Sequence, residues 1–210
     1  LVTGGMGYIG SHTVVELLNA GDNVIVVDNL VNSKIEVKEK IETITGKTFK
    51  CYEEDLINLN EVYRIFRENK IDSVIHFAAL KAVGESVSKP LEYYENNLIG
   101  TLNVLRAMKQ YNVKNFVFSS SATVYGEAKT MPILEDFELS ATNPYGRSKL
   151  IIEDVLRDLY NADKNFNIAI LRYFNPVGAH ESGLIGENPN GIPNNLMPYI
   201  TQVAIGKLSK

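Results

Sequence analysis

The chain has 210 residues, of which 45% are hydrophobic and 22% are charged, a balance typical of one large globular domain. Its net charge of −4 argues against the basic surface that nucleic-acid-binding proteins usually present. Its apolar runs are all shorter than the roughly 20 residues that a membrane-spanning helix needs. We therefore expect neither a nucleic-acid partner nor a membrane partner.

The predicted elements alternate along the chain, because short segments rich in Val and Ile are followed by longer amphipathic segments. Strands are expected at 1–3, 23–28, 47–55, 72–78, 114–120 and 167–174, and helices at 8–20, 59–69, 90–111 and 144–163. This order predicts right-handed βαβ units, and therefore an α/β fold with a doubly wound, Rossmann-type parallel sheet. The chain starts without Met inside an apparent strand and ends inside a helix-like pattern, so we expect a piece truncated at both ends.

A change of composition divides the chain after residue 174, where the sequence becomes rich in Gly, Pro and Asn. We expect a Rossmann domain over 1–174 and the beginning of a smaller substrate-binding lobe over 175–210. Ligands of such folds bind beyond the carboxyl ends of the strands. The residues that follow each strand are therefore the candidates for a site.

The first strand leads into a glycine-rich turn that opens a helix, with glycines at Gly4, Gly7 and Gly10. Glycine allows the backbone to approach a pyrophosphate closely at a helix N-terminus. Asp28 ends the next strand, where a carboxylate suits a ribose diol and repels a 2′-phosphate, so NAD is favoured over NADP. Asn29, Asn32 and Ser33 follow it and extend this predicted contact.

Two further strand ends offer weaker candidates. Asp55 suits either an adenine contact or a simple turn, and the spacing does not decide between them. Ala78 and Ala79 are small enough for a flat ligand to lie against them. Lys81 suits either a phosphate contact or an exposed position on the surface.

The segment "NPYGRSK" places Tyr145 four residues before Lys149, on one face of a predicted helix. Asn143 suits the N-cap of that helix and Pro144 its first position. Ser121 ends the preceding strand, at the predicted ligand edge. A phenol, an ammonium group and a hydroxyl in this order predict proton abstraction from an alcohol, with Lys149 lowering the phenol pKa.

The single cysteine and the three histidines predict no metal site. Cys51 is alone, so it forms no intrachain disulfide and no cysteine cluster, and a reducing, cytoplasmic setting is expected. His12, His76 and His180 lack ligand spacing. We expect His76 to be packed in the core and His180 to belong to a structural loop.

Several motifs taken together resemble the UDP-glucose 4-epimerase family of extended short-chain dehydrogenase/reductases. They are "SSSATVYG", "NPYGRSK", "HFAALKAVGES", "LRYFNPVGAH" and "GIPNNLMPY". The resemblance covers essentially the whole chain. It implies interconversion of UDP-glucose and UDP-galactose, in which a 4-keto sugar forms and a tightly held NAD is regenerated in each cycle.

The resemblance also implies roles for individual residues. Ser121, Tyr145 and Lys149 would be catalytic. Cofactor contacts would come from Gly4, Gly7, Tyr8, Ile9, Gly10, Asp28, Asn29, Asn32, Ser33, Asp55, Leu56, Phe77, Ala78, Ala79, Lys81, Asn96, Ser119, Tyr145, Lys149 and Tyr173. Substrate contacts would come from Lys81, Ser121, Ala122, Thr123, Tyr145, Phe174, Asn175, Asn195 and Leu196. A homodimer through the helices at 90–111 and 144–163 is expected by the same analogy.

Alternatives stay open at this point. A 4-epimerase of another UDP-sugar, such as a UDP-N-acetylhexosamine or UDP-glucuronate, would share these motifs. A nucleotide-sugar 4,6-dehydratase would carry an Asp-Glu pair where this chain has Ala122 and Thr123. A non-catalytic NAD-binding regulator would keep the glycine turn without the Ser121, Tyr145 and Lys149 set, and a simple alcohol dehydrogenase would release NADH.

Overall fold

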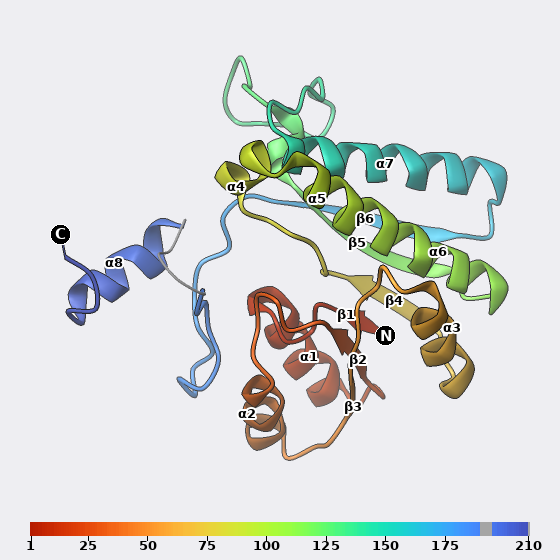
Figure 1. The fold of residues 1–210 in the computed structure, drawn as a ribbon, viewed down its shortest axis with the longest axis horizontal. Coiled ribbons are helices and arrows are strands. Elements are labelled where there is room, and N and C mark those ends of the chain that lie inside the picture. The colour runs from red at the N-terminus through yellow and green to blue at the C-terminus, as the bar shows by residue number, and fades with distance from the viewer. Residues whose placement is uncertain (190–194, 210) are drawn as a thin grey trace. The chain divides into compact units, whose positions relative to one another are not determined.

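A computed structural model describes residues 1–189 and 195–209 of the chain (Figure 1). Its strands are β1 (Val2–Thr3), β2 (Ile25–Asp28), β3 (Lys50–Glu53), β4 (Ser73–His76), β5 (Asn115–Ser121) and β6 (Asn167–Tyr173). They follow the order β3-β2-β1-β4-β5-β6 in one sheet, with parallel pairing. The predicted α/β fold with a doubly wound parallel sheet is therefore confirmed.

The helical segments agree with three of the four predicted helices and add others. They are α1 (Tyr8–Ala20), α2 (Glu36–Thr45), α3 (Leu59–Glu68), α4 (Val83–Ser88), α5 (Pro90–Tyr94), the π-helical η1 (Glu95–Ile99), α6 (Gly100–Gln110), the 3-10 segment η2 (Ala122–Tyr125), α7 (Pro144–Ala162) and α8 (Leu196–Ala204). The single helix expected over 90–111 is instead α5, η1 and α6 in succession. None of the described helices is both long and apolar enough to cross a bilayer.

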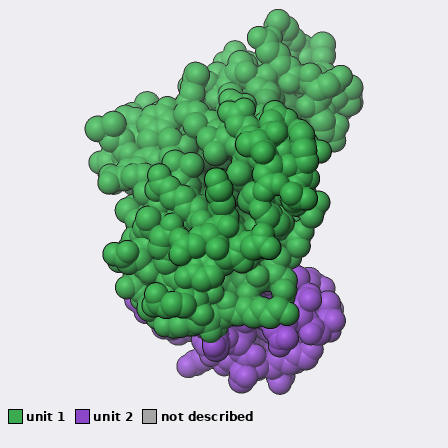
Figure 2. Space-filling view, turned by 90° about the vertical axis from the view of Figure 1, so that its right-hand side faces the viewer, with its two compact units in different colours: residues 1, 54–174 green, residues 2–53, 175–210 purple. Residues whose placement is uncertain are grey.

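The chain forms two compact units, which are coloured separately in Figure 2. Unit 1 contains residue 1 and residues 54–174, and unit 2 contains residues 2–53 and 175–210. Residues 190–194 and 210 lie outside the described part of unit 2. The lobes expected over 1–174 and 175–210 stay a prediction.

Unit 2 is built on β1, β2 and β3, with α1 packed against β1 and α2. Val14, Val15 and Val26 are fully buried there, because α1 turns its apolar stripe toward the continuously apolar strands. The helix ends at Gly21, whose φ of 96° places it in the left-handed region that favours glycine at a helix end.

Unit 1 is built on β4, β5 and β6, and α7 packs on β5 and β6. Phe116, Phe118 and Leu156 form its fully buried core. α7 also contacts α4, α5, η1 and η2. Because α7 contacts both strands and four helical segments, its side chains can meet residues from each of them.

The start of α7 is fixed locally by the residues that the sequence predicts for it. The Asn143 side chain accepts a hydrogen bond from the Gly146 backbone N–H at 2.8 Å, and Pro144 occupies the first helical turn. The predicted N-cap is therefore confirmed. It sets the residue at which the helix begins and, with it, the direction in which Tyr145 and Lys149 project.

Replacing Asn143 with Ala should lower the free energy of unfolding by about 1 kcal/mol, because an N–H of the first turn loses its acceptor. Urea unfolding of Asn143→Ala measures this change. The neighbouring exposed Thr142→Ala serves as the control and should stay within about 0.5 kcal/mol of the unmodified protein. Equal stability of the two variants would contradict the assigned cap.

Candidate active site

The glycine turn in unit 2 is close-packed in a way that only glycine permits. Gly4 has a φ of 67°, and a Cβ added to Gly10 would lie 2.1 Å from the Gly4 carbonyl oxygen. Gly7 is the N-cap of α1 and donates its N–H to the Gly4 carbonyl at 3.2 Å. The turn therefore brings bare backbone to the N-terminus of a 13-residue helix, where a phosphate is favoured.

Asp28 is 8% exposed and its carboxylate holds this turn together. Oδ2 accepts the Met6 N–H at 3.0 Å. Oδ1 accepts the Leu30 N–H at 3.0 Å and the Ser33 hydroxyl at 2.7 Å. Asp28 thus has a structural role that the sequence did not predict, and Ser33 serves that role. The predicted contact of Asp28 with ribose stays a prediction.

Tyr8, which we expected to contact the cofactor, makes contacts within unit 2. Its hydroxyl donates to the Gly178 carbonyl at 2.7 Å, and its ring meets the His12 ring edge-on at 5.3 Å between centroids. Burial, followed by the charge of Glu187, raises the pKa of Tyr8. His180 lies beside Ser182 in the same loop, at 2.9 Å between Nδ1 and Oγ.

The predicted reacting residues come together within unit 1. Lys149 is 3% exposed, and its Nζ donates to the Ser119 carbonyl at 2.7 Å. The same Nζ lies 4.9 Å from the Phe118 ring centroid and 5.9 Å from that of Tyr145. Ser121 accepts hydrogen bonds from the N–H and the hydroxyl of Thr123, at 3.2 and 3.0 Å.

Burial is the largest influence on the pKa values of Tyr145 and Lys149. Burial raises the pKa of Tyr145, and a side-chain hydrogen bond with Ser121 opposes that shift. Burial also lowers the pKa of Lys149 to about 7, which reduces the positive charge it carries near neutral pH. Removal from water thus dominates both groups. The predicted lowering of the Tyr145 pKa by Lys149 together with a nicotinamide stays a prediction.

Asn97 belongs to the cluster, although the sequence drew attention to its neighbour Asn96. The buried Asn97 amide donates to the Leu80 carbonyl at 3.1 Å and to the Ser148 hydroxyl at 3.0 Å. Its oxygen accepts the Leu80 N–H and the Asn96 amide, both at 2.9 Å. Asn97 therefore joins the loop after β4 to α7 at the residue before Lys149.

His76 packs in the core of unit 1, as predicted. It is fully buried beside Phe116 and Phe118, and its Nε2 lies 2.9 Å from the Thr101 hydroxyl. Burial, followed by the charge of Lys149, lowers its pKa to about 3. His76 is therefore neutral at physiological pH.

The remaining predicted residues are placed as follows. Asp55 caps a turn by accepting the Ile57 N–H at 2.9 Å, which agrees with the turn alternative. Leu56 is buried. Ile9, Phe77, Ala78, Ala79, Asn96, Ser119, Ala122, Thr123 and Tyr173 are partly buried, whereas Asn29, Asn32, Lys81, Phe174, Asn175, Asn195 and Leu196 are exposed. Over 1–189 and 195–209, the structure places no three His, Cys, Asp or Glu residues together as metal ligands.

Comparison with known proteins shows to which family this chain belongs. The model for GDP-mannose 4,6 dehydratase matches residues 1–210. The chain belongs to the GDP-mannose 4,6-dehydratase family. Among the relatives within this family, the UDP-glucose 4-epimerases of Bacillus subtilis and Haemophilus influenzae are 61% and 64% identical to the whole chain.

The solved structures of the family agree with the fold described above. The UDP-glucose 4-epimerase from Bifidobacterium longum, crystallised with NAD⁺ and UDP, is 57% identical over 100% of this chain with a TM-score of 0.97. The enzyme from Stenotrophomonas maltophila, with bound NAD and formylated UDP-arabinopyranose, is 50% identical over 99% with a TM-score of 0.96. The chain spans 62% of the two curated relatives, and 63% and 62% of the two crystallised chains.

The burial of neutral His76 should make stability depend on pH. A histidine in the unfolded chain titrates near 6.5, so between about pH 6.5 and 3 the unfolded state binds one more proton than the folded state. The free energy of unfolding should fall with acid by up to about 1.4 kcal/mol per pH unit from this group. Urea unfolding between about pH 7 and pH 4, compared with His76→Asn, isolates that slope, and identical slopes would contradict the assignment.

Proposed function

We propose that the whole protein interconverts UDP-glucose and UDP-galactose by transient oxidation at sugar C4 with a tightly held NAD. The assembly of Ser121, Tyr145 and Lys149 within unit 1 is the observation that carries the proposal. A hydroxyl hydrogen-bonded to a phenol, with a buried ammonium group 5.9 Å from the centre of the phenol ring, is suited to moving a proton on an alcohol. The identity of 61% to 64% with curated UDP-glucose 4-epimerases supports the choice of substrate.

The residues of unit 2 fit a dinucleotide. The close packing of Gly10 on the Gly4 backbone keeps side chains out of the turn at the N-terminus of α1, where a pyrophosphate is favoured. Gly4, Gly7 and Gly10 would hold that group, and Asp28 the adenosine ribose. When bound, NAD would supply the hydride acceptor and donor for sugar C4 and a positive charge that favours a phenolate.

Tyr145 would take the proton of the sugar 4-hydroxyl and later return it. Its pKa is raised by burial and lowered by the hydrogen bond with Ser121, so this hydrogen bond helps the phenol to act as a base. Ser121, with Thr123 beside it, would hydrogen-bond the reacting oxygen. Lys149 would hold the nicotinamide ribose from its fixed position at the Ser119 carbonyl.

The proposal also includes a site for the nucleotide part of the substrate. Asn175 and Asn195 are exposed amides that can pair with a base or a phosphate. Tight binding of the nucleotide would leave the sugar free to rotate. Each face of C4 could then face the nicotinamide in succession. A 4-epimerase of another UDP-sugar would use the same proton chemistry and is the alternative.

The family also contains dehydratases, and residues 122 and 123 bear on that alternative. Elimination of water needs an additional acid and base next to the reacting sugar. By the family resemblance, dehydratases carry an Asp-Glu pair here, whereas this chain has Ala122 and Thr123. The side chains at these positions favour epimerisation over dehydration.

We also propose that the protein is a cytoplasmic homodimer. α5 and α7, which lie in the predicted dimer helices, expose apolar side chains at Leu91 and Tyr160, with exposed fractions of 77% and 46%. Such side chains lose contact with water when two copies pair. The lone Cys51 supports a reducing setting, because a single cysteine forms no intrachain disulfide.

Full-length protein given UDP-galactose without added NAD should form UDP-glucose without net NADH. Tyr145→Phe should lower the turnover number at least about 100-fold, because the phenolic base is lost, and should keep NAD bound. A coupled assay for UDP-glucose and the absorbance of NADH measure the two quantities. Tyr111→Phe, which retains the ring that packs on Phe66, serves as the control.

Accumulation of NADH during turnover would instead favour an alcohol dehydrogenase. Absence of any turnover on UDP-sugars, with NAD bound, would favour the non-catalytic regulator. Unchanged turnover in Tyr145→Phe would refute the role of the phenol.

Gly10→Ala should abolish retention of NAD in the purified full-length protein, because the new Cβ would collide with the Gly4 carbonyl. Gly84→Ala is the matched control, since a Cβ at Gly84 meets no atom within 4 Å. NAD released by heat denaturation is quantified for each variant. A folded Gly10→Ala protein with a full complement of NAD would contradict the assigned pyrophosphate turn.

A further inference from the structure

Glu153 lies on the same face of α7 as the proposed base. It follows Lys149 by four residues and Tyr145 by eight, and side chains at these spacings align along a helix. Its side chain is 0% exposed. An ionised carboxylate so far from water needs strong hydrogen-bond donors to remain charged.

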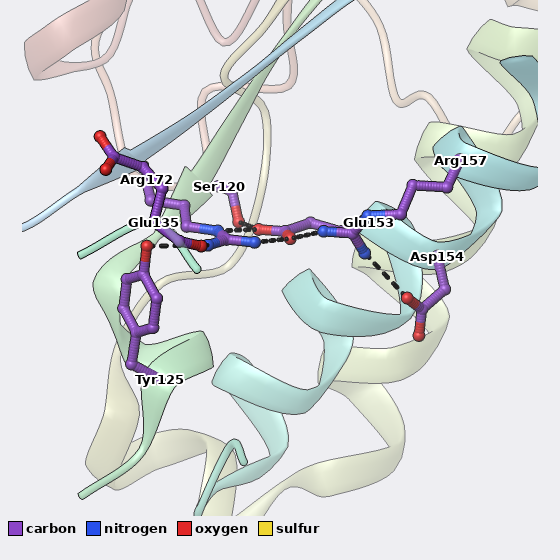
Figure 3. Close-up of polar contacts among 7 residues, drawn as sticks. All are labelled: Ser120, Tyr125, Glu135, Glu153, Asp154, Arg157 and Arg172. Atoms are coloured by element: carbon purple, nitrogen blue, oxygen red, sulfur yellow. Dashed lines mark hydrogen bonds and ion pairs between the residues drawn. The ribbon is translucent and has the colours of Figure 1, made fainter. Parts of the chain in front are cut away.

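Glu153 receives such donors from a strand hydroxyl and two guanidinium groups (Figure 3). Its Oε1 accepts the Ser120 hydroxyl at 2.6 Å and the Arg172 Nε at 3.0 Å. Its Oε2 accepts the Nη2 of Arg172 at 2.8 Å and the Nη2 of Arg157 at 2.7 Å. Arg172 therefore binds the carboxylate with two parallel hydrogen bonds, which fix both distance and orientation.

The protonation state of Glu153 agrees with this geometry. Burial raises its pKa, but hydrogen bonds from Arg172 and Ser120 outweigh burial, and the pKa is lowered overall. The carboxylate therefore remains ionised at neutral pH. Lys149 lies one turn away on α7, and burial lowers its pKa to about 7.

The partners of Glu153 immediately precede residues of the proposed site. Ser120 precedes Ser121 on β5, and Arg172 precedes Tyr173 on β6. The two strands pair in register at these positions, with Ser120 opposite Arg172 and Ser121 opposite Tyr173. One carboxylate on α7 thus holds the ends of both strands.

Arg172 extends the connection to the segment that follows β5. Its Nη1 donates to the Tyr125 hydroxyl at 2.7 Å and to the Glu135 carbonyl at 3.0 Å (Figure 3). Tyr125 ends η2, the 3-10 segment that begins with Ala122 and Thr123. The network therefore reaches four segments that carry proposed site residues, namely α7, the ends of β5 and β6, and η2.

We propose that Glu153 is a positioning residue, which sets the place of Tyr145 on α7 relative to Ser121 on β5 through its bonds to Ser120 and Arg172. The inference rests on the proposed function, because it concerns the alignment of the proposed base with its hydrogen-bond partner. A buried ion pair adds little to stability when its desolvation is counted, whereas its fixed geometry can select one arrangement of the segments it joins. A displacement of about 1 Å between reacting groups can cost about 100-fold in rate.

The test compares Glu153→Gln with Asp154→Asn in the full-length protein. Asp154 is the adjacent residue on α7, is 66% exposed and binds Arg157 at 2.9 Å rather than Ser120 or Arg172. Glu153→Gln should lower kcat 10- to 100-fold with little change in KM, because a donor NH₂ now faces the arginine donors. Asp154→Asn should keep kcat within about twofold.

The pH profile separates positioning from loss of folded protein. Loosening of the hydrogen bond between Ser121 and Tyr145 raises the phenol pKa, so the acid limb of kcat/KM should move to higher pH in Glu153→Gln. A lower folded fraction reduces the rate at every pH but does not change the pH at which the acid limb of kcat/KM falls. An unchanged limb in Glu153→Gln would overturn the proposal.

A second measurement does not depend on epimerase activity. With isotope-labelled tyrosine, the Tyr145 ring resonance, assigned by its loss in Tyr145→Phe, should shift in Glu153→Gln in the same direction as in Ser121→Ala. It should not move in Asp154→Asn. A failed UDP-galactose assay with this shift present would refute the proposed function alone, and an active enzyme without the shift would refute the positioning role alone.

Arg172→Lys provides a second variant in case Glu153→Gln does not fold. A lysine keeps the positive charge but replaces two parallel hydrogen bonds with a single flexible contact. It should move the acid limb and the Tyr145 resonance in the same direction as Glu153→Gln. If Arg172→Lys left both quantities at their unmodified values, the proposal would be overturned.

Discussion

The burial of the Lys149 ammonium group is the constraint on which the surroundings of the proposed base depend. The side chain is 3% exposed, and a cation removed from water must be compensated by oriented dipoles or aromatic faces. The Ser119 carbonyl and the ring of Phe118 supply this compensation from β5. A charged His76 would add repulsion at the same place, and its burial keeps it neutral. The apolar core and the reacting cluster of unit 1 are therefore one packed structure.

Two buried charges on α7 are stabilised in opposite ways. Lys149 and Glu153 are four residues apart, a spacing at which opposite charges on a helix often pair. Here Glu153 is instead bound by two guanidinium groups, and Lys149 is bound by a carbonyl. The carboxylate is thereby held by Ser120 and Arg172 of the sheet as well as by Arg157 of its own helix. Lys149 instead donates to the Ser119 carbonyl near the end of β5, and the bonds of Glu153 connect α7 to β5 and β6.

Much of the fold follows from patterns that are local in the sequence, whereas the polar contacts of the site do not. The apolar strands, the glycine turn and the Asn143 cap depend on neighbouring residues and were predicted. α2 and α4 were not predicted, because their apolar patterns are too short to stand out from loops. The burial of Asn97 could not be predicted, because the sequence does not show which of the adjacent residues Asn96 and Asn97 points inward. The π-helical geometry of η1 determines this direction. The effect of burial on the pKa values of Tyr145 and Lys149 could not be predicted, because the sequence shows a nearby lysine but not how much water both groups lose.

The π-helical segment η1 has a consequence for how this chain can vary in length. A π turn contains one residue more than an α turn, so Glu95–Ile99 acts as a single-residue insertion between α5 and α6. Each residue of an α-helix advances its side chain by about 100°, and deletion of one residue here would rotate α6 by that amount relative to α5. Asn97 could then no longer reach Leu80 and Ser148 while Tyr93 and Thr101 kept their buried positions. The packing of this region therefore constrains the number of residues between Tyr93 and Thr101 as well as the residue types at these positions.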